Sequence, residues 1–490
     1  MNPAPPVTMM RTAALSAAVA PFPRLHASRT SLVRAPLVLP ALLVLDAIVV
    51  ARDYPLKDAF VLAVLAAVAL LCKSRAHVVA ACAIVFGLAL GFYRQAPPQL
   101  EREIEHVRVG GVVVSDIVAQ AWGDSFEMRG PGGLRYALSV HERVAVGEHV
   151  VAVGRLEPFE SSWRDLARER GLSARLVDAH IVERAAPRYE IEALPARIRA
   201  SAGNALHRFL AEPDATVLAG MLYGARGSLP PELRAEFQDT GTVHVLVTAG
   251  LHLGVIAALA AFVFARLGFG RVPASLSAIP LVWMYAILSG GHVPSLRAAV
   301  MATVALAARA CGERALSLNT LALAAIAVAA IWPAWVGGAS FALSFSCVSA
   351  IVLFAEPIAS WLERVHVPGL FREPLALTFA TQLGVWPLTA STFLVIAPYA
   401  PLANLFVVPV VGIAMLGGIA LVATTPFPTL ANLVARIESW PLAWIEGVVH
   451  LTAHLPFAHL IATPPPDWTL AVYDCAMIVV AVLVRASASR

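Results

Sequence analysis

The chain has 490 residues, of which 59% are hydrophobic and 14% are charged, and its formal net charge is +4. Soluble domains carry about 25% charged residues, so this composition excludes a wholly soluble protein and predicts a polytopic helical membrane protein with a smaller soluble part. The net charge is too small to indicate nucleic acid by itself. The five cysteines form no C-x-x-C pair, so the sequence predicts neither a disulfide framework nor a zinc site.

The first 95 residues predict a leader and a group of membrane helices. Residues 1–31 are rich in Pro and Ala, contain arginines and lack acidic residues, which indicates a disordered cytoplasmic leader. In residues 32–95 the apolar segments Ala35–Ala51, Ala59–Cys72 and Val78–Tyr93 predict N-terminal membrane helices, although the second is short enough to be tilted or re-entrant. The flanking arginines and lysines place the N-terminus in the cytoplasm. If all three segments cross the membrane, the domain that follows them lies outside the cytoplasm.

Residues 101–190 change in character, with frequent charges and short alternating apolar runs. The predicted strands are Val107–Val118, Leu134–Val140, His149–Leu156 and Ala174–Val182, with Ser125–Met128 as a weaker fifth, and Trp163–Arg170 predicts a short helix. This inventory fits a small all-β barrel of the OB type. This region contains twelve Arg and fifteen Asp and Glu, so it has no excess of positive charge. Binding of single-stranded nucleic acid and a role as a spacer or gate therefore both stay open.

Residues 191–235 predict helices at the membrane surface. Ile191–Ala211 is amphipathic, with apolar residues along one side and arginines among the others. That pattern fits a helix lying in the interface between the lipid headgroups and the acyl chains. The apolar stretch Thr216–Gly227 follows it.

Residues 236–490 are a predicted transmembrane domain, which begins with an apolar segment that carries histidines. Thr242–Leu267 predicts a membrane-spanning helix containing His244, Gly250, His252 and Gly254. Polar groups at membrane depth usually face a partner, a cavity or a pathway, and glycines allow close packing or local unwinding. On one helix the two histidines would lie about 80° apart, which is not the spacing of a helical metal pair. Bonding between helices and a pathway role are the alternatives.

Further apolar segments complete roughly nine predicted spans in this half. They are Pro273–Gly290, Ala298–Cys311, Leu316–Val336, Ala339–Trp361, Leu375–Ile396, Pro401–Thr424, Pro441–Leu455 and Trp468–Val484. Most are long enough to cross about 30 Å of hydrocarbon. Pro441–Leu455 carries Glu446, His450 and His454, so it fits the membrane interface as well as a span.

Polar side chains inside these segments are the other candidates for a site. Pro294 suits the first turn of a helix, where Ser295 could bond a free N–H and Arg297 would form an anion site suited to phosphate. The alternative is an Arg297 paired with Glu313, Glu356 or a lipid headgroup. Further along are three more polar residues, Ser344, Gln382 and Asn404. They would either hydrogen-bond between helices or line a hydrated path.

These motifs together resemble the ComEC competence family. His244 to His252 is similar to the family's H-L-L-A-x-S-G-L-H, with Ala249 at the serine, and Tyr285 to Ala298 is similar to Y-x-x-x-x-G-x-x-x-S-x-x-R-A, with Pro294 at the serine and Ser295 one residue late. Ser340 to Phe345 resembles G-F-x-L-S-F, with Ser340 at the glycine. Thr381 to Pro387 resembles A-Q-x-x-x-x-P, with Thr381 at the alanine, and Leu402 to Pro409 resembles L-x-N-L-x-x-x-P. The resemblance covers about Val107 to Gly418.

The resemblance implies a multi-pass inner-membrane channel for the uptake of single-stranded DNA during natural transformation, with an OB-like domain that receives the strand outside. The residues it implies along the DNA path are His244, Gly250, His252, Ser295, Arg297, Ser344, Gln382 and Asn404. The partners it implies are single-stranded DNA, the lipid bilayer, a periplasmic DNA receptor and a cytoplasmic translocase or strand-binding proteins. A homo-oligomer is a further possibility.

The motifs that are absent from the sequence predict no catalytic residue, no metal and no cofactor. The sequence has no H-x-H-x-D-H and no phosphate-binding G-x-x-x-x-G-K-[ST], so we expect a non-enzymatic form without the C-terminal metallo-β-lactamase-like domain of many relatives. Two alternatives remain. One is a secondary transporter of a small anion, which also uses an Arg at a helix N-terminus. The other is a membrane enzyme that combines His244 and His252 with Asp239.

Overall fold

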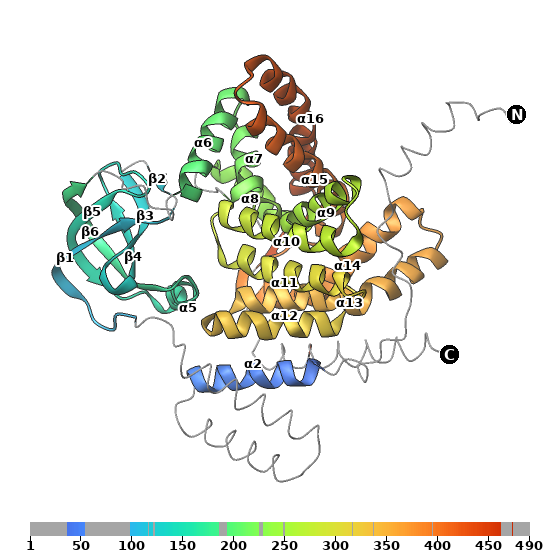
Figure 1. The fold of residues 1–490 in the computed structure, drawn as a ribbon, viewed down its shortest axis with the longest axis horizontal. Coiled ribbons are helices and arrows are strands. Elements are labelled where there is room, and N and C mark those ends of the chain that lie inside the picture. Colours follow the sequence, from blue (N-terminus) through green and yellow to red (C-terminus); the bar gives the residue numbers. More distant parts are fainter. Residues whose placement is uncertain are drawn as a thin grey trace, which may run out of the picture.

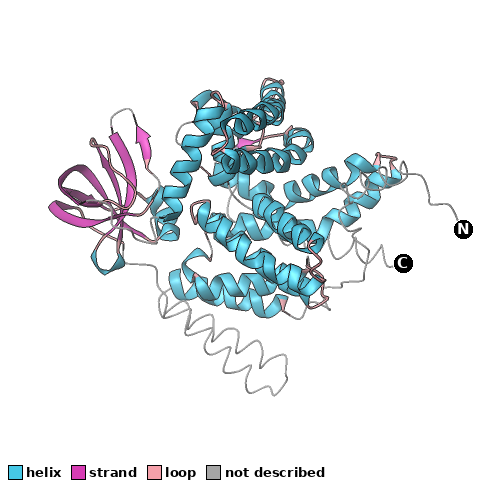
Figure 2. Cartoon of the chain, turned by 45° about the horizontal axis from the view of Figure 1, so that its top comes forward, coloured by secondary structure: helices cyan, strands magenta, loops and turns pink. Residues whose placement is uncertain are grey.

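The computed structural model describes residues 37–53, 99–461 and 473, except 116, 121–122, 186–193, 225–228, 248–249, 316, 337 and 394. A small β-structure stands beside a larger helical body (Figures 1 and 2). This arrangement confirms the predicted fold class, mainly helical with an inserted all-β part. The predicted leader and the segments Ala59–Cys72 and Val78–Tyr93 lie outside the described residues, as does Trp468–Val484 except for Tyr473.

The β-structure is one sheet that closes on itself. Its elements are β1 (Ile104–Val113), β2 (Val118–Gln120), β3 (Gly123–Arg129), the 3-10 turn η2 (Pro131–Gly133), β4 (Arg135–Val140), β5 (His149–Glu157), α5 (Ser161–Arg170) and β6 (Leu172–Ala185). The strand order is β1-β5-β6-β4-β3-β2, and an additional β1–β3 pairing closes the ring. β4 and β6 are parallel, and the other pairs are antiparallel. The single strand predicted over Val107–Val118 is wrong, because β1 ends at Val113 and β2 begins at Val118.

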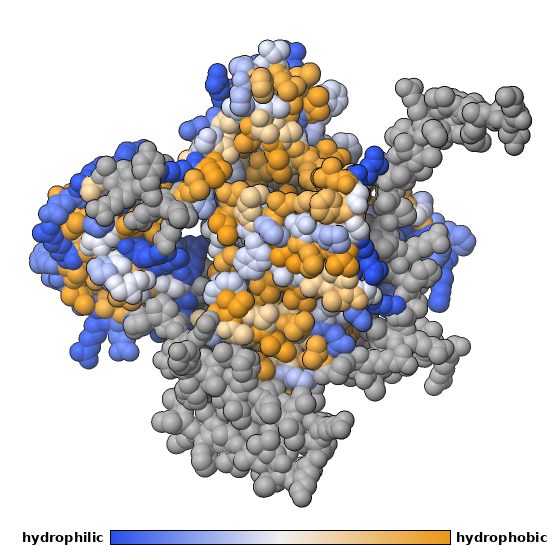
Figure 3. Space-filling model, viewed as in Figure 1, coloured by the Kyte–Doolittle hydropathy of each residue, from blue (hydrophilic) through white to orange (hydrophobic). Residues whose placement is uncertain are grey.

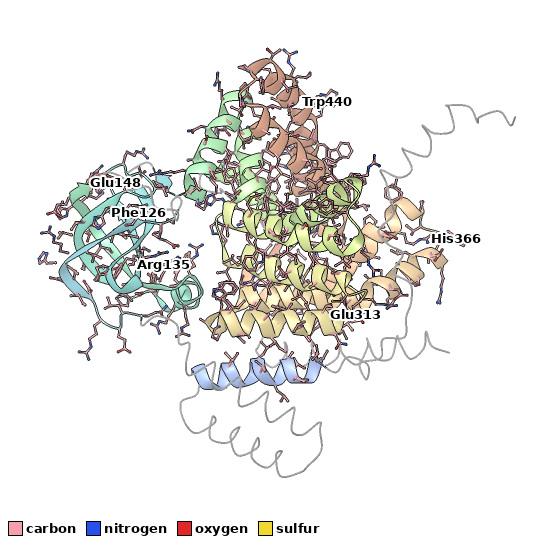
Figure 4. The ribbon with its side chains drawn as sticks, in the orientation of Figure 1. Phe126, Arg135, Glu148, Glu313, His366 and Trp440 are labelled. Atoms are coloured by element: carbon pink, nitrogen blue, oxygen red, sulfur yellow. The ribbon has the colours of Figure 1, made fainter. Side chains whose placement is uncertain are left out.

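Alternating apolar residues fill the barrel, and a glycine lets it close. Phe126, Met128 and Leu138 are buried in its core (Figure 4 labels Phe126). A Cβ built on Gly111 would lie 2.3 Å from the carbonyl oxygen of Arg129. Because only a residue without a side chain permits that approach, Gly111 allows β1 to meet β3 and complete the ring.

The helical body carries the rest of the described chain. Its helices are α2 (Val38–Asp53), α6 (Leu194–Phe209), α7 (Asp214–Tyr223), α8 (Pro231–Asp239), α9 (Gly250–Arg266), α10 (Arg271–Leu288), α11 (Val293–Ala310), α12 (Leu318–Ile331), α13 (Ala339–Arg364), α14 (Gly369–Phe393), α15 (Ala400–Thr424) and α16 (Pro428–Ala453). Two 3-10 turns, η4 (Val243–Leu246) and η5 (Pro333–Trp335), and a short pair of strands, β7 (Val395–Ile396) and β8 (Leu460–Ile461), complete it. α2 packs against α12, and α5 of the barrel approaches η5 (Figure 1).

Four helices of the described chain are long and apolar enough to cross a membrane, namely α10, α11, α13 and α15, and α9 and α12 are shorter apolar helices. The face of the helical body seen in Figure 3 is largely hydrophobic where it is coloured, whereas the barrel carries more hydrophilic residues. Large apolar side chains such as Met284 and Ile413 are exposed on it. In water such a surface would be unfavourable, so these observations identify a membrane protein.

The main core lies where α15 passes α7 and α16. Gly418 is close to α7, since a Cβ there would lie 2.8 Å from Leu218 Cδ1. Its neighbour Gly417 faces the carboxyl group of Glu438 on α16, which is 2% exposed. Small residues let helix backbones approach closely inside a membrane, and this stretch of α15 uses its glycines in that way.

The structure corrects three predicted segments. The span over Thr242–Leu267 is broken, because η4 is followed by extended backbone at Val247 and a separate helix begins at Gly250. The β-branched Val243, Val245 and Val247 have a slightly lower helix propensity, which adds to the break. Pro441–Leu455 is only the second half of α16, and Leu316–Val336 divides into α12 and η5. By contrast, α6 confirms the predicted amphipathic helix.

Candidate functional site

A buried turn connects α8 to His244–His252, the motif named the signature segment from here on. The hydroxyls of Thr240 and Thr242 lie 2.7 Å apart, and both residues are buried. The Thr240 hydroxyl also donates to the carbonyl of Glu236 at 2.9 Å, and the Thr242 N–H donates to the carbonyl of Phe237 at 2.9 Å. These bonds satisfy the last carbonyls of α8, as the end of a buried helix requires. They fix the direction in which the chain leaves the helix.

Gly241 holds this turn against the start of α15. Its φ is +67°, a left-handed conformation that favours glycine. A Cβ there would lie 2.8 Å from the Cβ of Ala400 and 3.2 Å from that of Ala397. There are therefore two structural reasons for a glycine at position 241, and this turn connects the signature segment to the helix that carries Asn404.

The two signature histidines lie in different environments. His244 belongs to η4, is exposed, and its Nδ1 lies 3.1 Å from the carbonyl oxygen of Gly241. His252 is in the first turn of α9, is fully buried, and hydrogen-bonds the backbone of Val245. The prediction that both lie on one helix is wrong. The fold still brings His252 back to η4 by that hydrogen bond, so one histidine is open to the surface and the other supports the turn.

Gly250 acts as a helix start and not as a packing contact. A Cβ at Gly250 or Gly254 would meet no described atom within 4 Å. Neither glycine is therefore in close helix packing with the described residues, and Gly250 is the first residue of α9 while Gly254 lies within it.

A second turn joins α10 to α11. Gly290 and Gly291 both have positive φ, +105° and +60°. Arg199 of α6 is buried and donates from Nη1 to the carbonyl of Leu288 at 3.2 Å, so it caps the end of α10. The Tyr285 hydroxyl donates to the carbonyl of Leu222, the residue before the last in α7, at 2.8 Å. Arg199 of α6 and Tyr285 thus fix the end of α10, from which the chain enters α11, the helix that carries Arg297.

Arg297 joins two of the predicted clusters. Pro294 is in the first turn of α11 as predicted, and Ser295 and Arg297 are 0% and 1% exposed. The Arg297 Nη2 donates to the hydroxyls of Ser340 at 2.8 Å and Ser344 at 2.9 Å, both on α13. Two short charge-assisted bonds hold the guanidinium in a fixed position. The sequence placed these serines in a different motif from Arg297, and the structure brings both of them to its guanidinium.

Pairing with a glutamate does not explain this arginine. Glu313 follows the end of α11, and at 1.5 Å per residue that end lies about 20 Å from Arg297. Glu356 is about 18 Å along α13 from Ser344 by the same measure. Glu313 is also exposed, whereas Arg297 is buried. The two ion pairs considered from the sequence are therefore wrong.

Gln382 and Asn404 are not joined to this cluster by any hydrogen bond among the described residues. Gln382 is half-buried on α14. Asn404 is 8% exposed on α15, and its Oδ1 has no hydrogen-bond partner in the described part of the chain. Near Gln382, Pro387 removes the N–H that would bond the carbonyl of Leu383, and the Tyr473 hydroxyl donates to that carbonyl at 2.6 Å. The proline is thus compensated by a residue from the end of the chain.

Sequence reasoning missed a group of carboxylates and histidines beside the signature turn. Glu236 of α8 lies 2.9 Å from Nδ1 of His450 on α16, and Asp239 lies 3.3 Å from Nδ1 of His459. Asp239, the carboxylate considered for an enzyme, therefore pairs with a histidine outside the signature. The i, i+4 spacing of His450 and His454 was the sequence signal that could have pointed to the group.

Comparison with known proteins identifies the family. The profile of the family described as "Competence protein" matches residues 221–487, which include every motif discussed above and exclude the barrel. The chain is 26% identical over 265 residues to ComE operon protein 3 of Bacillus subtilis (strain 168), and 26% identical over 267 residues to the uncharacterized protein YcaI of Escherichia coli (strain K12).

Each alignment covers 52% of this chain and 33% of the relative, so the chain matches about a third of the length of these proteins. No solved structure matches the chain. Because the family profile spans more than half of the chain and contains the buried turn, the arginine cluster and the motifs of α14 and α15, this membrane protein belongs to the competence protein family.

Proposed function

We propose that this protein is a channel of the inner membrane for the uptake of single-stranded DNA during natural transformation. Family membership supports a role in competence. The observation that carries the finer proposal is Arg297, a cation held at 1% exposure by hydroxyls of another apolar helix. A buried charge is costly at membrane depth and marks a pathway more often than a structural contact.

The chemistry of the proposed path suits phosphate. Arg297 lies near the N-terminus of α11, where the helix dipole adds positive potential. Together they favour an anion, and a phosphate in a DNA strand would replace serine hydroxyls as the partner of the guanidinium. Recognition of phosphate does not depend on sequence, as the import of arbitrary strands requires. His244, Gly250, His252, Ser295, Ser344, Gln382 and Asn404 complete the proposed path.

The barrel is proposed to have the OB type and to lie outside the cytoplasm, with the N-terminus inside. Its closed strand order with one parallel pair, β4 and β6, supports that type. Several barrel arginines are held by carboxylates, as in the pairs Arg143–Asp124 and Arg155–Glu157. Arginines that already have anionic partners bind a DNA backbone less strongly. We therefore propose that the barrel guides the strand and that the helical body holds it.

The protein is proposed to transport without catalysing a reaction. The driving force would come from a cytoplasmic translocase or strand-binding proteins, and the strand would be delivered by a periplasmic receptor. Assembly with further copies of the chain is compatible with this scheme.

The test is uptake of labelled DNA by cells that carry Arg297→Ala, with Arg309→Ala as the matched control. Arg309 is on the same helix and exposed. We expect Arg297→Ala to abolish uptake at normal membrane abundance while DNA is still held outside, and Arg309→Ala to transport normally. Normal uptake with Arg297→Ala would remove this residue from the path. If a full deletion took up DNA normally but lost accumulation of a small anion, the transporter alternative would replace the channel.

A further inference from the structure

The C-terminal end of α16 and the middle of α8 bring three metal-ligating side chains together. One donor atom from each of Glu236, His450 and His454 lies within 4.8 Å of the other two. All of them belong to the helical body, at the point where α8 leads into the signature turn. None has a place in the proposed DNA path.

The two histidines are presented by helix geometry. His450 is in the last turn of α16 and His454 is its C-cap, so residues four apart project from one face. Their ring centroids lie 4.2 Å apart. The i, i+4 histidine pair is the spacing by which one helix supplies two ligands to the same ion.

The hydrogen bond of His454 orients this histidine for ligation. His454 Nδ1 lies 2.8 Å from the carbonyl oxygen of His450, and since a carbonyl only accepts, this nitrogen carries the proton. Nε2 of His454 is then left with its lone pair. A backbone carbonyl on the second ring nitrogen is the usual support of a metal-bound histidine.

The third donor stands at ligand distance. Glu236 Oε1 is 2.9 Å from His450 Nδ1. Two donors on one ion with bonds of about 2.1 Å are about 3.0 to 3.4 Å apart. Because the carboxylate accepts in this hydrogen bond, Nδ1 of His450 carries the proton, and binding an ion there moves that proton to Nε2 or releases it to water. A small movement of the two side chains then lets both bind. The side chains are 67% exposed for His450 and 20% exposed for Glu236, so an ion and its water ligands can reach them from solution.

The electrostatic surroundings favour a cation. Glu446, one turn before His450, shares a hydrogen bond with Asp214. Two carboxyl groups hydrogen-bond through a shared proton, so this pair places one negative charge near Glu236. The C-terminal end of α16 adds the partial negative charge of the helix dipole. These groups would attract a divalent ion to the site without occupying its coordination positions.

We propose that Glu236, His450 and His454 bind a divalent transition-metal cation, with zinc as the best fit. Two imidazoles and one carboxylate are a ligand set of zinc and its neighbours and not of magnesium or calcium, which prefer oxygen. The ion would fasten α8 to α16 directly behind the turn of Thr240 and Gly241. It would thereby stabilise the position of the signature segment. The sequence prediction of no metal was based on other motifs and did not consider this trio.

The test measures zinc binding to the full-length protein in detergent, purified with a tag that contains no histidine. Zinc chloride is added, excess is removed, and bound zinc is counted by mass spectrometry, with affinity from calorimetry. We expect one zinc per chain and a loss of at least about 10-fold in affinity in His450→Gln and His454→Gln. His459→Gln is the matched control, because His459 is a nearby exposed histidine outside the trio, and it should bind as the unaltered protein does.

X-ray absorption of the unaltered zinc-loaded protein keeps the proposal testable should a variant fail to fold. Two imidazole ligands in the first coordination shell are expected. The proposal is overturned by a shell without imidazole, by equal binding in His450→Gln and His459→Gln, or by no zinc retained by the unaltered protein.

Discussion

Gly241 offers a quantitative test of how the signature turn is held. Its φ of +67° is left-handed, and an added Cβ would lie 2.8 Å from that of Ala400. In Gly241→Ala the left-handed conformation costs about 1–2 kcal/mol, and crowding against the packed start of α15 costs about 1–3 kcal/mol more. The expected destabilisation is therefore about 2–5 kcal/mol as the sum of those two terms.

A control and a rescue separate the two terms. Gly291 also has a positive φ, +60°, but a Cβ there would meet nothing within 4 Å, so Gly291→Ala should lose only the conformational part. Removing the opposing methyl group in Gly241→Ala/Ala400→Gly should recover part of the loss, although glycine in α15 costs up to about 1 kcal/mol.

The assay is thermal unfolding of the detergent-solubilised protein, followed as the fraction that stays monodisperse. The expected order of midpoints is unaltered protein, then Gly291→Ala, then the double variant, then Gly241→Ala. If Gly241→Ala were no less stable than Gly291→Ala, or if Ala400→Gly gave no rescue, the contact between the signature turn and α15 would not contribute to stability.

Three further predictions concern the barrel and α14. Gly111→Ala should open the barrel and expose it to limited proteolysis, because its Cβ would lie 2.3 Å from the Arg129 carbonyl oxygen, whereas Gly110→Ala, with a nearest contact of 3.4 Å, should stay resistant; equal cleavage would contradict this. Burial raises the pKa of Glu127 above its ordinary 4.5 although Arg170 and Arg135 lie beside it. The folded state therefore holds the proton more tightly than the unfolded state, and the stability that this group contributes falls as the pH rises from 4.5 through the raised pKa. Glu127→Gln should therefore melt at or above the unaltered protein at pH 7, with the difference vanishing below pH 4.5; a lower midpoint at pH 7 would show that the arginine pairs dominate. Tyr473→Phe should cost about 1 kcal/mol by leaving the Leu383 carbonyl without its donor, and less in a Pro387→Ala background where the helix supplies an N–H; equal costs in both backgrounds would refute that reading.

The sequence predicted the secondary structure well where one pattern dominates. Alternating runs such as His149–Leu156 became strands, and long apolar runs such as Pro401–Thr424 became helices, because periodicity and length reflect burial directly. It failed at Thr242–Leu267, since hydropathy measures burial and does not register the extended backbone at Val247 that separates η4 from α9.

For the site, motifs located the residues but not their contacts. The sequence identified Arg297 and Ser344 separately, and only the packing of α11 against α13 brings them to 2.9 Å. The Glu236–His450 pair joins residues more than two hundred positions apart, and a single sequence without an alignment contains no signal for such a contact. The exposure of Trp440 on α16, 80%, could not be predicted from the sequence either, because it depends on which face of the helix packs inward (Figure 4).

The most direct test of a DNA path through the helical body is cross-linking of a strand in transit. DNA is stalled during uptake by a bulky end group, and a thiol-specific photo-crosslinker is attached at Ser344→Cys beside Arg297 or, as the control, at Met284→Cys, a position 52% exposed on the outer surface of α10. The account predicts cross-links from position 344 and none from position 284. Stalled DNA that cross-links at 284 and not at 344, in variants of equal abundance, would contradict it.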